Sequence, residues 1–324
     1  MCTAATYKTK DHYFGRNLDL EYSYHETVTV TPRNYPFHFG KVNDLTCHYA
    51  MIGMAYVVEN YPLYYDATNE KGLSIAGLYF PGNAHYKQEL RGMDNVATFE
   101  LIPWILGQCG NISEVRVLLE HMNIWNENFS RELPAMPLHW MVSDREETIV
   151  LEAVSDGLKI YDNPVGVLTN NPPFDFQMFH LSNYMNVSAG QAENRFSKKI
   201  DLKACSKGMG GLGLPGDLSS ASRFVKAAFT RLNSVSGDSE SESISQFFHI
   251  LGSVDQQRGC VRLENQLYEI TVYSSCCNTD KGIYYYTTYE NRQISGVDMY
   301  RENLDGRQLI CYPLIQNQQI YMQN

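Results

Sequence analysis

Alternation of apolar and polar positions marks the first third of the chain and predicts β-strands there. Side chains along a strand point in turn to its two faces, so a half-buried strand repeats every two residues. The run TVTVT at residues 27–31 shows this pattern most clearly. Strands rich in β-branched or aromatic residues are predicted over residues 3–9, 13–20, 27–31, 49–58 and 72–80.

Two pairs of helices follow, and each pair is succeeded by more strands. The helices are predicted over residues 98–109, 113–122, 222–233 and 242–251. Asn111 and Glu114 resemble a capping box at the start of the second helix, although Asn replaces the usual Ser or Thr. The polar stretch SGDSESES near residue 240 predicts an exposed loop. The later strands are predicted over residues 138–144, 148–154, 157–162, 269–275 and 283–289.

This order of elements predicts an α+β fold. Paired helices between blocks of antiparallel strands fit two sheets sandwiched between helical layers, whereas a doubly wound parallel sheet would alternate single strands with single helices. No internal repeat, low-complexity tract or Pro/Ser-rich linker divides the 324 residues. We therefore expect a single domain over residues 1–324.

Composition and charge exclude several classes of function. A chain that is 44% hydrophobic and 19% charged has the makeup of a globular protein rather than a disordered one. Its net charge of -10, without any Lys/Arg-rich run, argues against nucleic-acid binding. No apolar stretch approaches the ~20 residues that span a bilayer, and the N-terminus lacks the apolar core of a secretory signal. We expect a cytoplasmic protein without nucleic-acid or membrane partners.

The cysteines indicate neither disulfides nor a metal site, and most of them are expected to be small buried hydrophobic residues. In a reducing cytoplasm, the eight cysteines are expected to be thiols. None has the paired CxxC spacing of a zinc site, so no metal is predicted.

Cys2 is the main candidate for a nucleophile. A small residue at position 2 permits removal of Met1, which would leave a thiol and a free α-amine on one residue. Reference pKa values of about 7.7–8.0 for an α-amine and about 8.5 for a thiol let such an amine take a thiol proton near neutrality. The alternative is that position 2 is simply variable and carries no function.

Arg16 and Asp19 lie on the next predicted strand, within FGRNLD. A guanidinium favours a thiolate, and a carboxylate can hold an ammonium or a thiol in place. As an ordinary surface ion pair, the two residues would contribute little. They have opposite parity on a regular strand, so both reach one site only where that strand ends, bends or bulges.

Motifs along nearly the whole chain resemble the choloylglycine hydrolase family, most closely the bile salt hydrolases of Gram-positive gut bacteria. The related penicillin V acylases share the fold. The motifs are MCTAATY, YFGRNLDLEYSY, VTPRNYP, YPLYYDATNEKGLSIAGL, ELIPWILGQC, PLHWMVSD, DNPVGVLTNNP, GLPGDLSSASRFVKAAF and QFFHILGSV, in this order. The resemblance implies a four-layer αββα N-terminal-nucleophile hydrolase sandwich and hydrolysis of an amide between an acyl group and a small amine. It also implies no cofactor and a homotetramer.

The same resemblance implies roles for five site residues. Cys2 would be the nucleophile, with Arg16 and Asp19 as its immediate partners. Asn170 of VLTNNP is similar to an asparagine whose side-chain amide helps to form the oxyanion hole, and Arg223 of SASRF is similar to a distal catalytic arginine. Without the resemblance, Asn170 would be a loop residue and Arg223 a first-turn helix residue.

Tyr79 is where the chain departs from the bile salt hydrolases. They usually read GLNFPG, whereas this chain reads GLYFPG, and penicillin V acylases are similar to it in having tyrosine there. In the family, the backbone N–H at this position serves the oxyanion hole, and a changed side chain leaves that donor in place. We expect Tyr79 to affect substrate choice more than catalysis.

A bile-acid acyl group is a large apolar sterol and needs a wide hydrophobic pocket. The residues placed as the family's pocket loops would be are Leu20, Tyr22, Tyr24, Met136 and Leu138. Core packing is the alternative for each, and Met136 is the strongest candidate because flanking prolines predict a loop. The expected function is hydrolysis of glycine- or taurine-conjugated bile acids. The alternatives are a penicillin V acylase and a non-catalytic sterol-binding protein that retains Met1.

Overall fold

The first sheet is built around the N-terminal hairpin. In the computed structural model, which describes residues 1–264 and 266–324, strands β1 (Cys2–Lys8) and β2 (His12–Leu20) pair antiparallel and are almost fully buried. The sheet has six strands in the order β12-β1-β2-β13-β14-β15. The added strands are β12 (Val167–Leu168), β13 (Ile270–Asn278), β14 (Ile283–Thr288) and β15 (Ser295–Asp298).

The second sheet has eight strands in the order β11-β10-β9-β6-β5-β4-β3-β16. These are β3 (Thr27–Thr31), β4 (Met51–Val58), β5 (Tyr61–Asn69), β6 (Ser74–Tyr79), β9 (Leu138–Ser143), β10 (Thr148–Val154), β11 (Gly157–Asp162) and β16 (Ile310–Pro313). All neighbours in both sheets pair antiparallel, and a separate parallel pair joins β7 (Asp94–Ala97) to β8 (Met122–Trp125).

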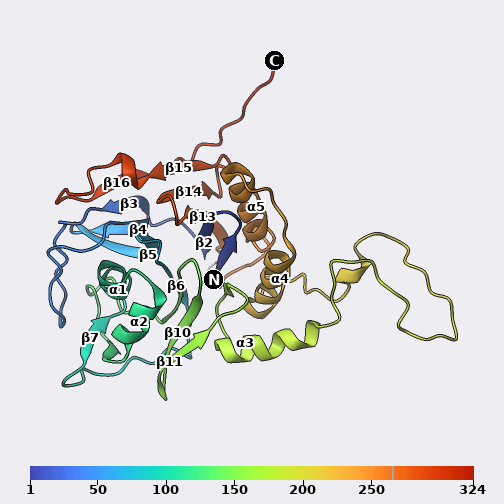
Figure 1. The fold of residues 1–324 in the computed structure, drawn as a ribbon, viewed down its shortest axis with the longest axis horizontal. Coiled ribbons are helices and arrows are strands. Elements are labelled where there is room, and N and C mark those ends of the chain that lie inside the picture. The colour runs from blue at the N-terminus through green and yellow to red at the C-terminus, as the bar shows by residue number, and fades with distance from the viewer. Residues whose placement is uncertain (265) are drawn as a thin grey trace.

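Helices cover the outer face of each sheet (Figure 1). They are α1 (Leu101–Gln108), α2 (Ile112–Leu119), α3 (Phe174–Leu181), α4 (Ser220–Asn233) and α5 (Glu240–Gly252), with short 3-10 turns at Ser182–Tyr184, Met209–Gly211 and Met299–Arg301. α1 and α2 pack on the eight-stranded sheet, and α4 and α5 on the six-stranded sheet. No helix in the described part of the chain is long and apolar enough to cross a membrane.

Burial follows the two-residue repeat of the strands, which produces the layers. On β6, Ala76 and Leu78 face the other sheet, whereas Ile75, which precedes Ala76, packs with α1 and α2. One apolar core therefore lies between the sheets and under α4 and α5, and another lies under α1 and α2. The predicted α+β sandwich of two antiparallel sheets is confirmed.

Several predicted boundaries were wrong for identifiable reasons. The predicted loop at SGDSESES ends early, because Ser239 accepts from the Glu242 N–H and forms a capping box that starts α5 at Glu240. Strand β5 was missed, because its inward positions include Pro62 and Asp66, two residue types that strands disfavour. Of the capping box predicted at Asn111, the N-cap bond from the Glu114 N–H is confirmed, but the Glu114 carboxylate accepts from the Gly110 N–H instead of the Asn111 N–H. All eight cysteines are free thiols, as expected.

Candidate active site

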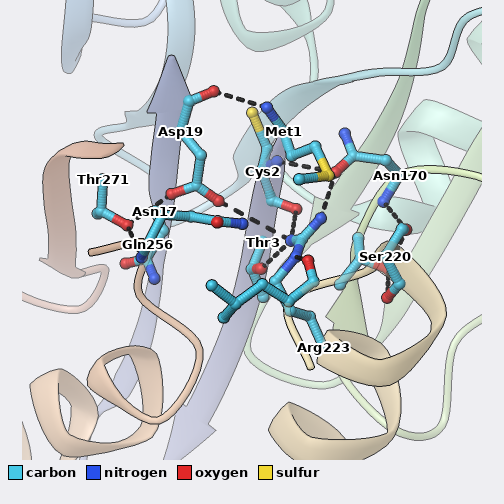
Figure 2. A network of polar contacts seen from close by, with 12 residues as sticks. Met1, Cys2, Thr3, Asn17, Asp19, Asn170, Ser220, Arg223, Gln256 and Thr271 are labelled. Carbon is cyan, nitrogen blue, oxygen red and sulfur yellow. Dashed lines mark hydrogen bonds and ion pairs between the residues drawn. The ribbon is translucent and has the colours of Figure 1, made fainter. Parts of the chain in front are cut away.

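Cys2 opens strand β1 and is 4% exposed beneath Met1. Its backbone N–H donates to Asn170 Oδ1 at 2.8 Å. The Met1 amino group donates to the Asp19 carbonyl at 2.7 Å and pairs with the Glu269 carboxylate, a buried group that sequence reasoning missed. With Met1 in place, the Cys2 nitrogen is therefore an amide, and the position of the candidate base is occupied (Figure 2).

Arg16 shares the face of β2 that lies beside the Cys2 side chain. Opposite residues of an antiparallel pair share a face, and Cys2 lies opposite Leu18, two positions from Arg16. The guanidinium Nη1 donates to the carbonyls of Tyr65 and Gly77 on the other sheet, at 2.9 and 2.6 Å. Tyr65 is the extra residue of a β-bulge in the β4–β5 pair, which frees its carbonyl from the ladder.

Arg16 is fully buried, and the groups around it keep it charged. Burial lowers the pKa of Arg16, but the charges of Cys2, Tyr273 and Asp66 outweigh burial and leave that pKa raised. Within the described residues, the Arg16 guanidinium bonds to backbone carbonyls and forms no ion pair with a carboxylate, so its positive charge is available to Cys2.

Asp66 lies behind Arg16 and was also missed from the sequence. Its carboxylate accepts from the Tyr273 and Tyr284 hydroxyls at 2.7 Å each, and from Ser275 Oγ at 3.3 Å. Ser275 Oγ in turn accepts from the backbone N–H of Arg16 at 3.1 Å. Burial raises the pKa of Asp66, against the opposing effect of Arg16. The only signal in the sequence is a lone acid in the aromatic run YPLYYD.

Asp19 lies on the opposite face of β2 from Arg16. Its carboxylate accepts from Thr271 Oγ1 at 2.6 Å and lies 3.9 Å from Arg223 Nη1. A β-bulge faces Asp19, but it lies in β13, between Thr271 and Tyr273, whereas β2 itself pairs with β1 in an unbroken register, so the irregularity predicted for β2 is absent. The two residues therefore approach Cys2 from different sides of the sheet. Burial raises the pKa of Asp19, and the Arg223 charge opposes that shift.

Arg223 connects Asn170 to Cys2 from the first turn of α4. Its Nη1 donates to the Cys2 carbonyl and to Thr3 Oγ1 at 2.6 Å each, and its Nη2 donates to Asn170 Oδ1 at 2.8 Å. Burial lowers the pKa of Arg223 while Asp19 and Cys2 raise it, but a guanidinium stays protonated in proteins. Arg223 thus fixes the backbone of Cys2 and the amide of Asn170 together.

The orientation of the Asn170 amide follows from its partners. Oδ1 accepts from both Cys2 N–H and Arg223, so Nδ2 must be the group that donates to the Tyr79 carbonyl at 2.7 Å. Nδ2 carries two hydrogens, and no second acceptor for them is found in the described part of the chain. One N–H of Asn170 is therefore free to bind a substrate oxygen.

Tyr79 is the last residue of β6, and its backbone faces Asn170. Phe80 N–H donates to the Pro137 carbonyl next to β9, at 2.7 Å. Successive backbone groups of a strand point to opposite edges, so the Tyr79 N–H and carbonyl point away from β9, to the edge where Asn170 binds that carbonyl. The side chain is 40% exposed and takes no part in this geometry.

Three of the five predicted pocket residues are exposed. Tyr22, Tyr24 and Met136 are 48%, 38% and 48% exposed, whereas Leu20 and Leu138 are partly buried against the two cores. The rings of Tyr22 and Tyr24 lie 4.9 Å apart.

Two neighbours extend this set. Tyr56, which sequence reasoning missed, continues the aromatic surface with its ring 6.3 Å from that of Tyr24. Tyr86 ties the Met136 loop to β9, because its hydroxyl donates to the Met136 carbonyl and accepts from the Leu138 N–H. No group of three or more His, Cys, Asp or Glu side chains suited to a metal ion occurs within residues 1–264 and 266–324.

Comparisons with known proteins show which proteins the chain is similar to. The chain is 58% identical over its full length to the bile salt hydrolase/transferase of Lactiplantibacillus plantarum, with 100% of both chains covered. It is 39% identical to that of Clostridium perfringens, with 96% of each covered. The crystal structure of a mutant conjugated bile acid hydrolase from Clostridium perfringens matches with a TM-score of 0.93 at 37% identity, covering 100% of both chains.

Penicillin V acylase from Agrobacterium tumefaciens shares the fold, with a TM-score of 0.74 at 19% identity over 95% of this chain and 90% of that one. Residues 2–312 match the family described as linear amide C-N hydrolases, choloylglycine hydrolase family. With its nucleophile candidate at the start of β1 and matched relatives of equal length, the chain belongs to the choloylglycine hydrolase family of amide C–N hydrolases.

Proposed function

We propose that the protein is a bile salt hydrolase that cleaves the amide bond of glycine- or taurine-conjugated bile acids with Cys2 as nucleophile. The observation that carries the proposal is that Asn170 and Arg223, from distant parts of the chain, bond to the Cys2 backbone, while the Arg16 charge lies on the Cys2 side of the same hairpin. The 58% identity to a bile salt hydrolase/transferase supports the substrate class.

Acylation begins after Met1 has been removed. The α-amine of Cys2 takes the thiol proton, and the thiolate, next to the Arg16 charge, attacks the substrate carbonyl carbon. The oxyanion accepts from the free N–H of Asn170 Nδ2 and from the Tyr79 N–H. The α-ammonium then gives its proton to the leaving amine, the C–N bond breaks, and a thioester on Cys2 remains.

Deacylation uses the same groups in the reverse order. The α-amine takes a proton from water, and the hydroxide formed attacks the thioester carbonyl. The second oxyanion accepts from the same two N–H groups, and the thiolate leaves and regains its proton. Asp19 and Arg223 hold the start of β1 in place, because Arg223 binds the Cys2 carbonyl and lies beside Asp19.

Parallel release assays test the substrate class. Purified enzyme with confirmed loss of Met1 is given glycocholate, taurocholate and penicillin V at equal concentrations, and the free amine or the penicillin nucleus is measured. We expect hydrolysis of at least one bile salt with a kcat/KM above that for penicillin V. Hydrolysis of penicillin V alone would overturn the proposal in favour of an acylase.

Penicillin V acylase activity is the second candidate, and Tyr79 is the observation that favours it. We expect Tyr79→Asn to keep kcat within about tenfold, because the backbone donor stays and losing one donor outright costs ~10²–10³. The kcat/KM ratio of penicillin V to glycocholate should fall by one to two orders of magnitude, about 1.4–2.8 kcal/mol. An unchanged ratio would place selectivity in the loops around Tyr22 and Met136.

We further propose one domain over residues 1–324, a cytoplasmic location and a homotetramer. The core between the sheets contains residues from β1 to Leu304, which supports one domain. Eight unpaired cysteines support a reducing compartment.

The homotetramer is supported by an exposed apolar surface. The segment after α3 extends away from the body (Figure 1) and, with α3, exposes large apolar side chains. They are Phe176, Phe179, Met185, Phe196 and Leu212. Such a surface suits burial against other copies of the chain.

Light scattering tests the assembly. We expect the wild-type protein to have the mass of four chains, and the double variant Phe179→Asp/Met185→Asp to have a smaller mass, because each charge would be desolvated in an interface. The active-site contacts come from one chain, so the smaller species should still release the amine. Exposed Val117 on α2 offers a matched control, since Val117→Asp should leave the mass unchanged. A wild-type mass of one chain would contradict the homotetramer.

A further inference from the structure

His139 and Glu152 form a buried pair of titratable side chains that the mechanism above does not use. They lie on neighbouring strands β9 and β10, with Nδ1 and Oε1 3.0 Å apart, and both are 0% exposed. Glu152 Oε2 has no hydrogen-bond partner within the described residues. Because burying such a pair costs desolvation that well-packed apolar residues would avoid, stability alone does not account for it.

His139 contacts the chain next to both proposed oxyanion donors. Its Nε2 lies 2.8 Å from the carbonyl of Thr169, the residue directly before Asn170. Its ring stacks on Phe80, directly after Tyr79, with ring centroids 4.2 Å apart and planes 5° apart. One imidazole therefore contacts the segment of each donor, although the two segments come from different sheets.

Glu152 holds the far side of the Asn170 segment. Its Oε1 accepts from the backbone N–H of Phe174, the first residue of α3, at 3.0 Å. The segment from Thr169 to Phe174 is thus fixed at both ends by the same pair. Gln177 adds a bond inside it, because its Nε2 donates to the Asn170 carbonyl at 2.6 Å.

The partners also determine where the protons lie. A carbonyl can only accept, so His139 Nε2 carries a hydrogen, and the Phe174 N–H can only donate, so Glu152 Oε1 accepts it. One proton between Nδ1 and Oε1 completes the pair, which has no net charge whichever of the two atoms holds it. The pair can therefore orient neighbouring groups without adding a net charge near the oxyanion.

We infer that His139, backed by Glu152, is the positioning residue of the oxyanion hole, setting the separation of the Asn170 amide from the Tyr79 N–H. The inference rests on the proposed amide hydrolysis at Cys2. His139 itself touches no reacting atom. Its effect is to hold two donors from different sheets where a tetrahedral oxyanion can accept from both.

His139→Phe tests this role, because phenylalanine can keep the stack on Phe80 but cannot bond the Thr169 carbonyl. We expect kcat for glycocholate to fall ~10- to 100-fold, with KM changed less than about threefold, as for an interaction made only in the transition state. Alkylation of Cys2 by iodoacetamide forms no oxyanion, so its rate should stay at the wild-type value. A general collapse of the site would instead slow both reactions.

His48→Phe is the matched control. His48 is also a buried histidine between two backbone carbonyls and beside a phenylalanine, but it lies in the core under α1. We expect it to lower the melting temperature and to leave kcat within about twofold. Should His139→Phe not fold, His139→Gln decides, since its amide reaches the Thr169 carbonyl but leaves Phe80 unstacked. We expect kcat reduced ~3- to 10-fold there, with alkylation unchanged.

The outcomes separate the two proposals. If the wild-type enzyme releases glycine and the folded His139 variant matches it in kcat, the positioning role is overturned and the proposed function stands. Parallel losses in kcat and alkylation would also overturn it. If the wild-type enzyme hydrolyses no amide substrate, the proposed function fails and the role of His139 falls with it.

Discussion

Cys2→Ser should lose at least about a thousandfold in kcat for conjugated bile salts while folding as the wild type does. A hydroxyl is far less ionised than a thiol beside the same α-amine, and removing a nucleophile eliminates the covalent route. The bonds at this residue are made by its backbone N–H and carbonyl, so the serine variant keeps the contacts to Asn170 and Arg223. Amine release measures turnover, and circular dichroism with a melting curve measures the fold.

Cys109→Ser is the control for this substitution. Cys109 is another buried, free cysteine, but it lies at the end of α1 in the core under that helix. We expect Cys109→Ser to lower stability and to leave kcat near the wild-type value. Turnover by Cys2→Ser at the wild-type rate would refute the nucleophile assignment, and with it the proposed mechanism.

A chain that keeps Met1 behind an uncleavable N-terminal tag should be inactive, with kcat reduced at least about a hundredfold. The nitrogen of Cys2 is then an amide that donates to Asn170 Oδ1 and has no basicity. The best comparison is the same tag with a protease site whose cleavage leaves Cys2 as the first residue. Mass spectrometry confirms each N-terminus, and amine release is measured before and after cleavage.

Full activity in the uncleaved protein would show that the α-amine is not the base. The same mass measurement on native protein addresses the non-catalytic sterol-binding alternative. A native chain that retains Met1 and binds conjugated bile acids without releasing the amine would support that alternative.

Local patterns predicted the framework of the site, and tertiary contacts determined the rest. β-branched and aromatic residues predicted two strands over residues 3–9 and 13–20, which pair in the structure as the hairpin that carries Cys2, Arg16 and Asp19. Nothing in spacing could bring Asn170 and Arg223 to Cys2, because those contacts join residues 168 and 221 positions apart. Their selection came from motif resemblance, and their roles remain predictions.

Irregular backbone explains most of what the sequence did not reveal. One of the two carbonyls that bind Arg16, that of Tyr65, is free because Tyr65 is the extra residue of a β-bulge, and a bulge has no reliable local signature. Asp66 in the same strand interrupts the apolar pattern, which hid both the strand and the buried acid. Side chains alternate between the two faces of a strand, and this rule correctly placed Arg16 and Asp19, which are three positions apart, on opposite faces of β2.

Because Met1 pairs with β2 in the folded chain, we expect removal of Met1 to compete with folding. The Asp19 N–H donates to the Met1 carbonyl at 2.9 Å, and the Met1 amino group bonds to the Asp19 carbonyl and to Glu269, so the peptide bond between Met1 and Cys2 is held against the end of β2. We expect an aminopeptidase to cut that bond faster in a chain end that has not yet paired with β2 than in the folded protein. A preparation in which synthesis saturates the peptidase would contain two populations of identical fold, only one of them competent. Its specific activity would then report the efficiency of processing.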